Sequence, residues 1–405
     1  MFRKKCLICY SINLKEIIDL GIHPFADTFI SKKNLNKSEK VYPLIVQLCS
    51  KCGNIQLKCE TSPEDRYQEN EYSYTSSNSE YSKSYWKKYS KEVLNLFPNK
   101  SKLKILEIGS NDGFLLGELK KFGHTVFGVD ASDKMKKIAS KKNINTMLAI
   151  FSKKNSKKIL KKKGRFEIII ANNVFNHADN PQDFFQGVDK LLTKKGIFIF
   201  ESPYWFNSIK SGKFDQIYHE HVIYFTARSI NKLVEMNNLF VKDVKVTEYH
   251  GGSIRFIVSR KKNEEGLIKI NNLINKENKL GLYNIFFYKK FMKNLKQRKN
   301  KFMKKIYTSL IKSEPLICVG AAAKANTFLN FYGLDNKIVR YVTDASKNKI
   351  GKYTPLTRIP IMPDMIIKKF KKPNVIFTAW NVSDNLKKII LKINPTFTEQ
   401  NPYDN

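Results

Sequence analysis

Long apolar runs are missing from this sequence: none approaches the roughly 18 uninterrupted apolar residues of a transmembrane helix, so we expect no membrane partner. The amino-terminal segment has basic residues but only a broken apolar stretch, and no small-residue cleavage site follows it, so we expect no secretory signal. Cysteine is scarce, at 6 of 405 residues, which argues against a disulfide scaffold and favours a reducing, cytoplasmic location.

Acidic residues are also in short supply, with 36 Asp and Glu against 73 Lys and Arg, and the formal net charge is +37. Such a balance can indicate a nucleic-acid partner. The lysines, however, are spread over the whole chain in short clusters such as those at 152–163 and 289–305. We therefore interpret the charge as a solvated basic surface that favours anionic ligands such as nucleotide phosphates, and nucleic acid is the disfavoured partner.

Apolar residues make up 42% of the chain, which is enough for two or three folded domains. In the middle of the chain, predicted strands at 104–108, 125–129, 166–171 and 196–201 alternate with predicted helices at 114–122, 133–141 and 181–192, after a first helix at 84–96. The same rhythm returns near the C-terminus, with strands at 316–319, 338–342 and 374–378 and helices at 322–331 and from 383. Strands that alternate with helices predict parallel, Rossmann-like sheets, here two of them in one α/β chain.

Four of the cysteines form two CxxC pairs, Cys6 with Cys9 and Cys49 with Cys52. Each CxxC turn can bring two thiolates to one ion, and two such turns complete a tetrahedral shell. A redox pair is the alternative, but a redox CxxC is expected once, at the start of a helix beside a strand. We predict a structural zinc site that has no open coordination position and therefore no catalytic role.

A glycine-containing turn, LEIGSNDGF at 106–114, follows the first strand of the middle block, where a backbone that approaches a ligand closely needs glycine. The next strand ends at Asp130, whose carboxylate can accept hydrogen bonds from both hydroxyls of a ribose. A nicotinamide enzyme would prefer GxGxxG, whereas an acidic residue before a GxxxG turn favours S-adenosylmethionine. A plain strand–turn–helix is the structural alternative. The predicted cofactor-binding residues are Glu107, Gly109, Asn111, Gly113, Asp130, Asn172 and Asn173.

With these features the chain resembles the three-domain bacterial sugar C-methyltransferases, which methylate a carbon of deoxy-keto nucleotide sugars. The resemblance covers almost the whole chain. Besides the cysteine pairs, it is carried by further motifs in the family's order, namely GIHPFAD at 21–27, YHEHVIYF at 218–225, HGGSIR at 250–255, GAAAKANT at 320–327 and AWN at 379–381. Ala325 stands where the family pattern has glycine.

The resemblance implies an α/β fold with a class I S-adenosylmethionine-dependent methyltransferase domain at its centre. A small zinc-binding domain is expected at 1–75, the methyltransferase domain at 76–262, a helical connector at 263–302, and a second Rossmann-like domain, which binds substrate, at 303–405. The implied cofactors are S-adenosylmethionine and structural zinc. We expect a monomer or a homodimer.

Methylation of carbon requires removal of a proton next to a carbonyl group, and it therefore needs a base and donors for the enolate oxygen. The family's base is the second histidine of the YHEH motif, which implies His221 as the base. Glu220 and Tyr218 would orient the sugar or the enolate, and His219 is interpreted as a packing residue. The residues expected to bind substrate are Tyr74, in an aromatic lid, and His177, Tyr224, His250, Arg255 (on a phosphate), Lys324 and Asn326.

The predicted activity is therefore methyl transfer from S-adenosylmethionine to a carbon of a nucleotide-diphosphate keto-deoxysugar. O- or N-methylation of a nucleotide sugar is the alternative. A zinc-containing nucleic-acid methylase is disfavoured, because the chain has neither the Asn/Asp-Pro-Pro-aromatic motif that holds an exocyclic amine nor a recognisable RNA-binding module.

Overall fold

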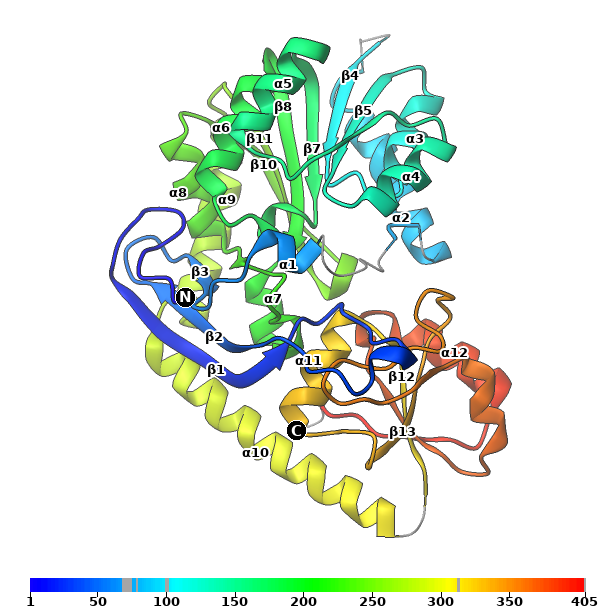
Figure 1. The fold of residues 1–405 in the computed structure, drawn as a ribbon. Helices are drawn as coiled ribbons and strands as arrows, with labels where there is room; N and C mark the ends of the chain where they lie inside the picture. Colours follow the sequence, from blue (N-terminus) through cyan, green and yellow to red (C-terminus); the bar gives the residue numbers. More distant parts are fainter. Residues whose placement is uncertain (68–74, 78, 99–101, 312–313, 404–405) are drawn as a thin grey trace.

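The computed structural model describes residues 1–67, 75–77, 79–98, 102–311 and 314–403 of the chain (Figure 1). Its strands form three sheets, of four, seven and five strands. The two larger sheets lie at opposite ends of the molecule, and the N-terminal sheet lies at their side. None of the helices in these described ranges has the length and hydropathy of a membrane span.

The N-terminal sheet is antiparallel and is completed by a strand from the middle of the chain. Its order is β1 (Leu14–Pro24), β2 (Val41–Cys49), β3 (Ile55–Leu57) and β9 (Ile223–Tyr224). β9 comes directly after the YHEH motif and pairs with β3, placing Tyr224 opposite Ile55. The motif is therefore attached to the N-terminal domain. A short helix, α1 (Pro63–Tyr67), follows β3.

The middle sheet has seven strands. Its parallel part runs β8 (Leu192–Pro203), β7 (Phe166–Asn172), β4 (Lys104–Ile108), β5 (Thr125–Asp130) and β6 (Thr146–Leu148). At the β8 edge, β11 (Ser253–Ser259) runs antiparallel to its neighbours, and β10 (Phe240–Thr247) lies outermost. β4 and β7 are almost continuously buried, as expected for parallel strands that are covered by helices on both faces.

The helices around this sheet start where the sequence supplies capping side chains. The hydroxyls of Ser132 and Ser152 and the amide oxygen of Asn180 each accept a hydrogen bond in the first turn of α4, α5 and α6, respectively. The helices of this domain are α2 (Glu80–Leu94), α3 (Phe114–Lys121), α4 (Asp133–Lys141), α5 (Lys153–Lys163), α6 (Pro181–Leu191), α7 (Trp205–Lys210) and α8 (Ala227–Met236).

The C-terminal sheet is entirely parallel. Its order is β14 (Ile361–Met362), β13 (Val339–Thr343), β12 (Leu316–Val319), β15 (Asn374–Phe377) and β16 (Thr398–Glu399), with helices α11 (Ala323–Tyr332) and α12 (Ser383–Ile393). In this sheet and in the middle one, the first strand lies between the second and the fourth. Open α/β sheets bind ligands at this switch point, outside the carboxyl ends of the strands. The α/β fold with two Rossmann-like domains is the one predicted from the sequence.

Two helices connect the two Rossmann-like domains. α9 (Glu264–Leu280) packs on β10, and α10 (Ile285–Ile311) runs along β1 to the C-terminal domain (Figure 1). α10 extends beyond residue 302, where the connector was expected to end. Its buried residues recur at helical spacing on one face and join a core shared with the N-terminal sheet and the C-terminal domain; they are Tyr288, Leu295, Phe302 and Ile306. This shared core ties the three parts together.

Candidate active site and zinc site

The four cysteines of the two CxxC pairs meet in one cluster. The Sγ atoms of Cys6 and Cys52 lie 3.6 Å apart, as do those of Cys9 and Cys49, and all four lie within 4.8 Å of one another. A tetrahedral zinc with Zn–S bonds of about 2.3 Å needs sulfur–sulfur distances of about 3.8 Å. The thiols therefore fit a zinc ion with little rearrangement.

The zinc site is connected to the middle domain. Next to Cys9, the carbonyl oxygen of Ile8 accepts a hydrogen bond of 3.0 Å from Nε2 of Gln182, in α6. The Sγ of Cys6 itself is approached by the backbone N–H of Ile8 and by the side-chain amide of Asn54. Contacts of this kind orient thiolate ligands and reduce their charge. The cluster thus fixes the start of the chain against the methyltransferase-like domain.

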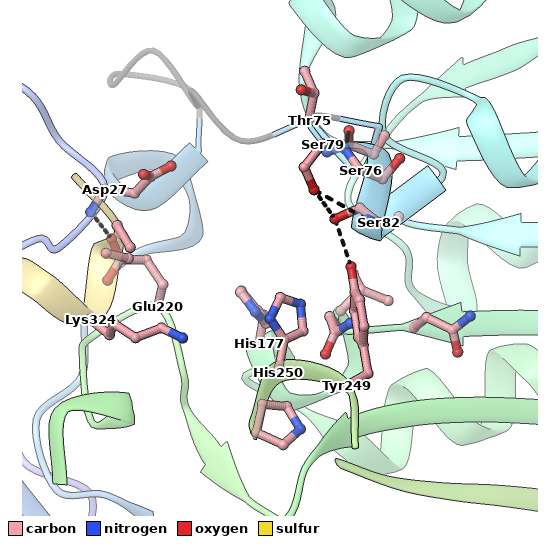
Figure 2. Close-up of a pocket in the computed structure, with 18 of the residues that line it drawn as sticks. Asp27, Thr75, Ser76, Ser79, Ser82, His177, Glu220, Tyr249, His250 and Lys324 are labelled. Atoms are coloured by element: carbon pink, nitrogen blue, oxygen red, sulfur yellow. Dashed lines mark hydrogen bonds between the residues drawn. The ribbon is translucent and has the colours of Figure 1, made fainter. Parts of the chain in front are cut away.

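A cavity of about 640 Å³ lies between the switch points of the two parallel sheets. All three domains line it: Asp27 comes from the N-terminal domain, Gly109 follows β4, and Gly320 follows β12. Figure 2 shows Glu220 and Lys324 on one side, the serines of the segment before and within α2 on the other, and His177, His250 and Tyr249 between them.

The middle-domain half of the cavity has two acidic side chains. Asp130 accepts backbone hydrogen bonds of 2.8 Å from Asn111 on one carboxylate oxygen and from Ser132 on the other. Burial raises the pKa of Asp130 and, far more strongly, that of Glu107. The Oε2 atom of Glu107 is buried and has no hydrogen-bond partner among the described residues. An unpaired acceptor beside a second carboxylate fits a ligand that carries an amine and hydroxyl groups, as S-adenosylmethionine does.

The glycine turn after β4 is required by packing. Gly109 has a φ of +69°, and a Cβ atom there would lie 2.7 Å from the side chain of Val174. Asn111, Asn172 and Asn173 line the cavity with Gly109, whereas Gly113 lies at the N-cap of α3 and shapes the turn.

The segment before α2 is held against this turn by Asp112. The Ser76 hydroxyl donates to Oδ1 of Asp112 at 2.5 Å, and the Ser77 hydroxyl donates to Oδ2. The backbone N–H of Ser76 donates to Oδ1 of Asn111 at 2.9 Å. This segment therefore covers the cofactor half of the cavity. Tyr74, predicted to belong to a lid over the sugar, lies outside the described residues.

The imidazole of His221, which lines the cavity, makes two polar contacts. Its Nδ1 lies 3.0 Å from the carbonyl oxygen of Gln216, and its Nε2 lies 2.7 Å from the hydroxyl oxygen of Tyr218. A carbonyl oxygen only accepts, so Nδ1 carries the proton and the lone pair of Nε2 accepts from Tyr218. Burial, followed by the nearby Lys324 charge, lowers the pKa of His221 to about 3. The ring is therefore neutral, and the lone pair of Nε2 can accept a proton once the hydrogen bond from Tyr218 is broken.

The two residues before His221 point in different directions. Glu220 lines the cavity and accepts backbone hydrogen bonds from Asp27 (2.9 Å) and Ala26 (3.4 Å), while burial raises its pKa to about 7. His219 turns towards the N-terminal sheet, where its Nε2 donates to the carbonyl oxygen of Pro43 at 3.3 Å. Its ring packs on aromatic side chains there. Of the two histidines, His221 is the one that reaches the cavity.

Three further predicted residues lie around His221. The ring centroid of His177 is 5.1 Å from that of His221, and burial lowers the pKa of His177 well below its ordinary value. Burial lowers the pKa of His250 to about 3. Lys324 donates to Oδ1 of Asn381 at 2.5 Å, and burial lowers its pKa to about 8. All three line the cavity, with one cation among neutral imidazoles.

The prediction that Arg255 binds a phosphate needs correction. Its Nε donates to Glu201 at 2.6 Å and its NH1 to Glu92 at 2.7 Å, and the side chain is only 5% exposed. The guanidinium also lies 4.1 Å from the ring centroid of Tyr89. Arg255 is fully engaged inside the middle domain because Glu201, on the neighbouring strand β8, supplies the countercharge.

Tyr224 and Asn326, also predicted to bind substrate, are buried connecting residues. The Tyr224 hydroxyl donates to the carbonyl oxygen of Tyr218 at 3.4 Å. The Asn326 side-chain amide donates to the carbonyl oxygen of Ala26 at 2.5 Å. Both bonds hold cavity-lining loops in place, so a role in positioning fits their location better than direct contact with substrate.

Sequence reasoning missed Asp344, whose carboxylate accepts 2.8 Å hydrogen bonds from the backbone of Ala321 and of Ser346. An aspartate directly after the second strand of the repeated strand–helix rhythm was a usable signal for it. It also missed two residues that line the cavity, Asp27 at the end of the GIHPFAD motif and Gln216 in the turn at 214–216. Only the three-dimensional arrangement brings them to the cavity.

Comparison with known proteins gives matches along the whole chain. Family models match in succession: a zinc binding domain at residues 6–67, a methyltransferase domain at 81–243 and a C-methyltransferase C-terminal domain at 248–396. The C-methyltransferase NovU of Streptomyces niveus is 24% identical over 391 residues, which are 95% of this chain and 93% of NovU. The chain is therefore a methyltransferase with a zinc-binding domain, a methyltransferase domain and a C-methyltransferase C-terminal domain, in that order.

Two further proteins are similar to part of the chain. The ubiquinone biosynthesis O-methyltransferase of Pelagibacter ubique (strain HTCC1062) is 33% identical over 95 residues, 24% of this chain and 40% of that protein. The magnesium protoporphyrin IX methyltransferase of Synechocystis PCC 6803, solved with bound SAM, has a TM-score of 0.35 at 15% identity, covering 44% of this chain and 79% of that one. The N-terminal domain, which contains the four-cysteine cluster, is a zinc-binding domain.

Proposed function

We propose that this enzyme methylates a carbon next to the carbonyl group of a nucleotide-linked keto-deoxysugar and that His221 is the base. The observation that carries the proposal is the neutral imidazole of His221 inside the cavity, with Nδ1 protonated by its contact to Gln216 and Nε2 available as a proton acceptor. A sugar methylated on oxygen or nitrogen would need no acidic C–H bond, whereas carbon methylation does.

The proposed chemistry begins at Nε2 of His221. Tyr218 donates its hydroxyl proton to this atom in the free enzyme, so the substrate must displace the hydroxyl or pass its proton through it. His221 then takes the proton from the carbon next to the carbonyl, and the electrons of the C–H bond form an enolate. Lys324, whose charge acts on His221 and His250, would offset the charge of the enolate oxygen. Glu220 would fix the sugar through its hydroxyls.

S-adenosylmethionine, when bound, supplies the methyl group, which leaves its sulfur as the new carbon–carbon bond forms. Asp130 would hold its ribose and Glu107 its amino group, because these carboxylates face the same half of the cavity. Asp112 holds the serine segment over that half, which would exclude water from the transfer.

The nucleotide of the sugar would lie in the C-terminal half of the cavity. Asp344 lies there at the end of the second strand, the place that binds ribose in dinucleotide folds. Lys349 also lines the cavity and adds a positive charge that can offset a diphosphate. The proposed place of action is the cytoplasm, where a reducing environment keeps zinc-binding thiolates available.

Deuterium exchange tests this function directly. Nucleotide-linked 4-keto sugars are incubated with the enzyme in D2O without methyl donor, and then with labelled S-adenosylmethionine. We expect exchange at the carbon next to the keto group and label on that same carbon. Label on a hydroxyl oxygen of the sugar would contradict the proposal, and so would methylation by an enzyme that catalyses no exchange.

A further inference from the structure

Asp215 is a buried carboxylate that joins the middle domain to the C-terminal domain. It lies in the turn at 214–216, is 0% exposed, and belongs to the middle domain. Its Oδ2 atom accepts a 2.6 Å hydrogen bond from Nε1 of Trp380 and a 2.7 Å bond from the hydroxyl of Tyr403. Both donors come from the C-terminal domain, so one oxygen atom receives two bonds from that domain.

The residue after Asp215 holds the catalytic histidine. The carbonyl oxygen of Gln216 accepts from Nδ1 of His221, which sets the tautomer of the ring. The side-chain amide of Gln216 donates to the carbonyl oxygen of His250 at 3.1 Å. Asp215 therefore contacts the C-terminal domain, and the next residue, Gln216, contacts both His221 and the backbone of His250.

The indole ring of Trp380, which donates to Asp215, also packs against the His250 turn and lies near Lys324. Gly251, next to His250, has a φ of +81°, and a Cβ atom there would lie 2.2 Å from the indole ring of Trp380. The Nζ atom of Lys324 lies 4.5 Å from the centroid of the same indole. The position of this ring thus affects both the His250 turn and the cation of the active site.

Nearby cations balance the buried charge of Asp215. The Nζ atom of Lys213 lies 3.2 Å from the ring centroid of Tyr403 and 4.7 Å from that of Trp380. Burial raises the pKa of Asp215, and the charges of Lys324 and Lys213 offset part of this shift. A buried carboxylate between two cations and two donors fixes the geometry of its neighbours more tightly than an apolar contact would.

We propose that Asp215 and Tyr403 are positioning residues that couple docking of the C-terminal domain to the tautomer and orientation of His221. This proposal rests on the proposed function, in which His221 is the base. His221 then has the tautomer and orientation needed for proton removal only while the C-terminal domain is docked through Trp380 and Tyr403. In the proposed function, this domain carries the nucleotide. Neither Asp215 nor Tyr403 touches substrate.

The test uses Tyr403→Phe, with Asp215→Asn as a second variant. Tyr403→Phe removes a hydroxyl that is remote from the substrate and leaves the ring in place. The matched control is Tyr332→Phe, because the Tyr332 hydroxyl contacts the same tail, at the carbonyl oxygen of Pro402 (3.4 Å), without bonding to Asp215. The full-length protein with its metal is used throughout, and thermal melting verifies that each variant is folded.

The first readout is the tautomer of His221, followed by the 15N shifts of the imidazole nitrogens in the enzyme without sugar. The His221 signal is identified by its loss in His221→Asn. We expect a single Nδ1–H tautomer in the wild type and in Tyr332→Phe, and a mixture of tautomers in Tyr403→Phe and Asp215→Asn. A purely structural contact would change the melting temperature without changing the tautomer.

The second readout is turnover, measured as deuterium exchange and methylation. A misplacement of about 1 Å can cost roughly 100-fold, so we expect kcat to fall on the order of tenfold in Tyr403→Phe, with unchanged affinity for S-adenosylmethionine. A wild-type tautomer and wild-type turnover in Tyr403→Phe, or an equal loss in Tyr332→Phe, would overturn the coupling. If no keto sugar is methylated by the wild type, the proposed function fails, and the tautomer measurement still decides the coupling.

Discussion

Asp130 and Asp344 occupy the same position in two different sheets. Each residue lies at the C-terminal end of the second strand of its sheet. Its carboxylate accepts two backbone hydrogen bonds of 2.8 Å, one from the turn after the first strand and one from the residue two positions further along the chain. Both carboxylates line one cavity. The cavity therefore has two carboxylates in equivalent positions, one from each parallel sheet, and in the proposed function each of them binds a ribose.

The first prediction separates these two positions. Asp130→Asn should weaken binding of S-adenosylmethionine by about 1.5–3 kcal/mol, the usual contribution of a hydrogen bond to a charged group, and leave nucleotide binding unchanged. Asp344→Asn should have the opposite selectivity. Calorimetric titration of each variant with S-adenosylmethionine and with a nucleoside diphosphate measures both effects. Equal weakening of both ligands by either variant would contradict the assignment.

The second prediction concerns His221. His221→Asn should lower kcat by about 10²–10⁴-fold, the usual contribution of a general base, and should abolish deuterium exchange while both ligands still bind. His219→Asn is the matched control, because that ring packs in the N-terminal sheet; it should lower the melting temperature and leave exchange close to wild type. Exchange that persists in His221→Asn would move the base to Glu220, His177 or His250.

The third prediction is the pH profile of kcat/KM. Glu220 has a pKa raised to about 7 by burial, so its carboxylate is lost as the pH falls below 7. Lys324 has a pKa lowered to about 8, so its charge is lost as the pH rises above 8. His221 stays neutral down to about pH 3, so its protonation does not change kcat/KM near neutral pH. We expect a narrow bell with its maximum between pH 7 and 8.

Glu220→Gln tests which group causes the acidic limb. The variant removes the titrating carboxylate, so the remaining activity should no longer fall between pH 7 and 6. An acidic limb near pH 6.5 that persists in Glu220→Gln would show that an imidazole titrates there instead.

The fourth prediction concerns the metal. Purified enzyme should contain about one zinc per chain, measured by elemental analysis, and Cys49→Ser should lower the melting temperature strongly. The chemical step should change less than the stability, since the cysteine cluster lies apart from the cavity lining. Metal-free protein with an unchanged melting curve would contradict the structural role. Cys59→Ser, a buried thiol outside the cluster, is the control.

The fifth prediction follows from the surroundings of Arg255. Removing one partner of a buried ion pair leaves the other charge uncompensated and typically costs about 3–5 kcal/mol. Arg255→Met should therefore lower the free energy of unfolding by several kcal/mol, measured in urea, while the variant that still folds binds the sugar nucleotide normally. A selective rise in the KM of the sugar nucleotide would restore Arg255 as a phosphate ligand.

The sequence predicts the central elements of both Rossmann-like domains closely. β4, β12 and α4 have the residue ranges predicted for them, because buried parallel strands read as short apolar runs and Ser132 marks the start of α4. The N-terminal hairpin of β1 and β2 was harder to predict, because its register shifts twice and breaks the alternation of side chains.

The candidate site could be predicted from the sequence only where a single motif contains all the side chains that a function needs. The YHEH motif predicts a base, but its sequence cannot show that His219 faces the N-terminal sheet while His221 faces the cavity. Arg255 looks like a phosphate ligand until Glu201 is placed beside it. Contacts such as Asp215 to Tyr403 depend on the docking of two domains, and no local pattern encodes that docking.

The pairing of β3 with β9 has a consequence for the synthesis of this protein. Ile55 leaves the ribosome long before Tyr224, its partner across the sheet, so the N-terminal sheet stays one strand short while most of the methyltransferase domain is translated. An unpaired strand edge exposes backbone groups that other chains can pair with. The nascent chain would therefore pass through a stage that is vulnerable to aggregation. This stage would end when the segment that carries the YHEH motif emerges and supplies the missing strand.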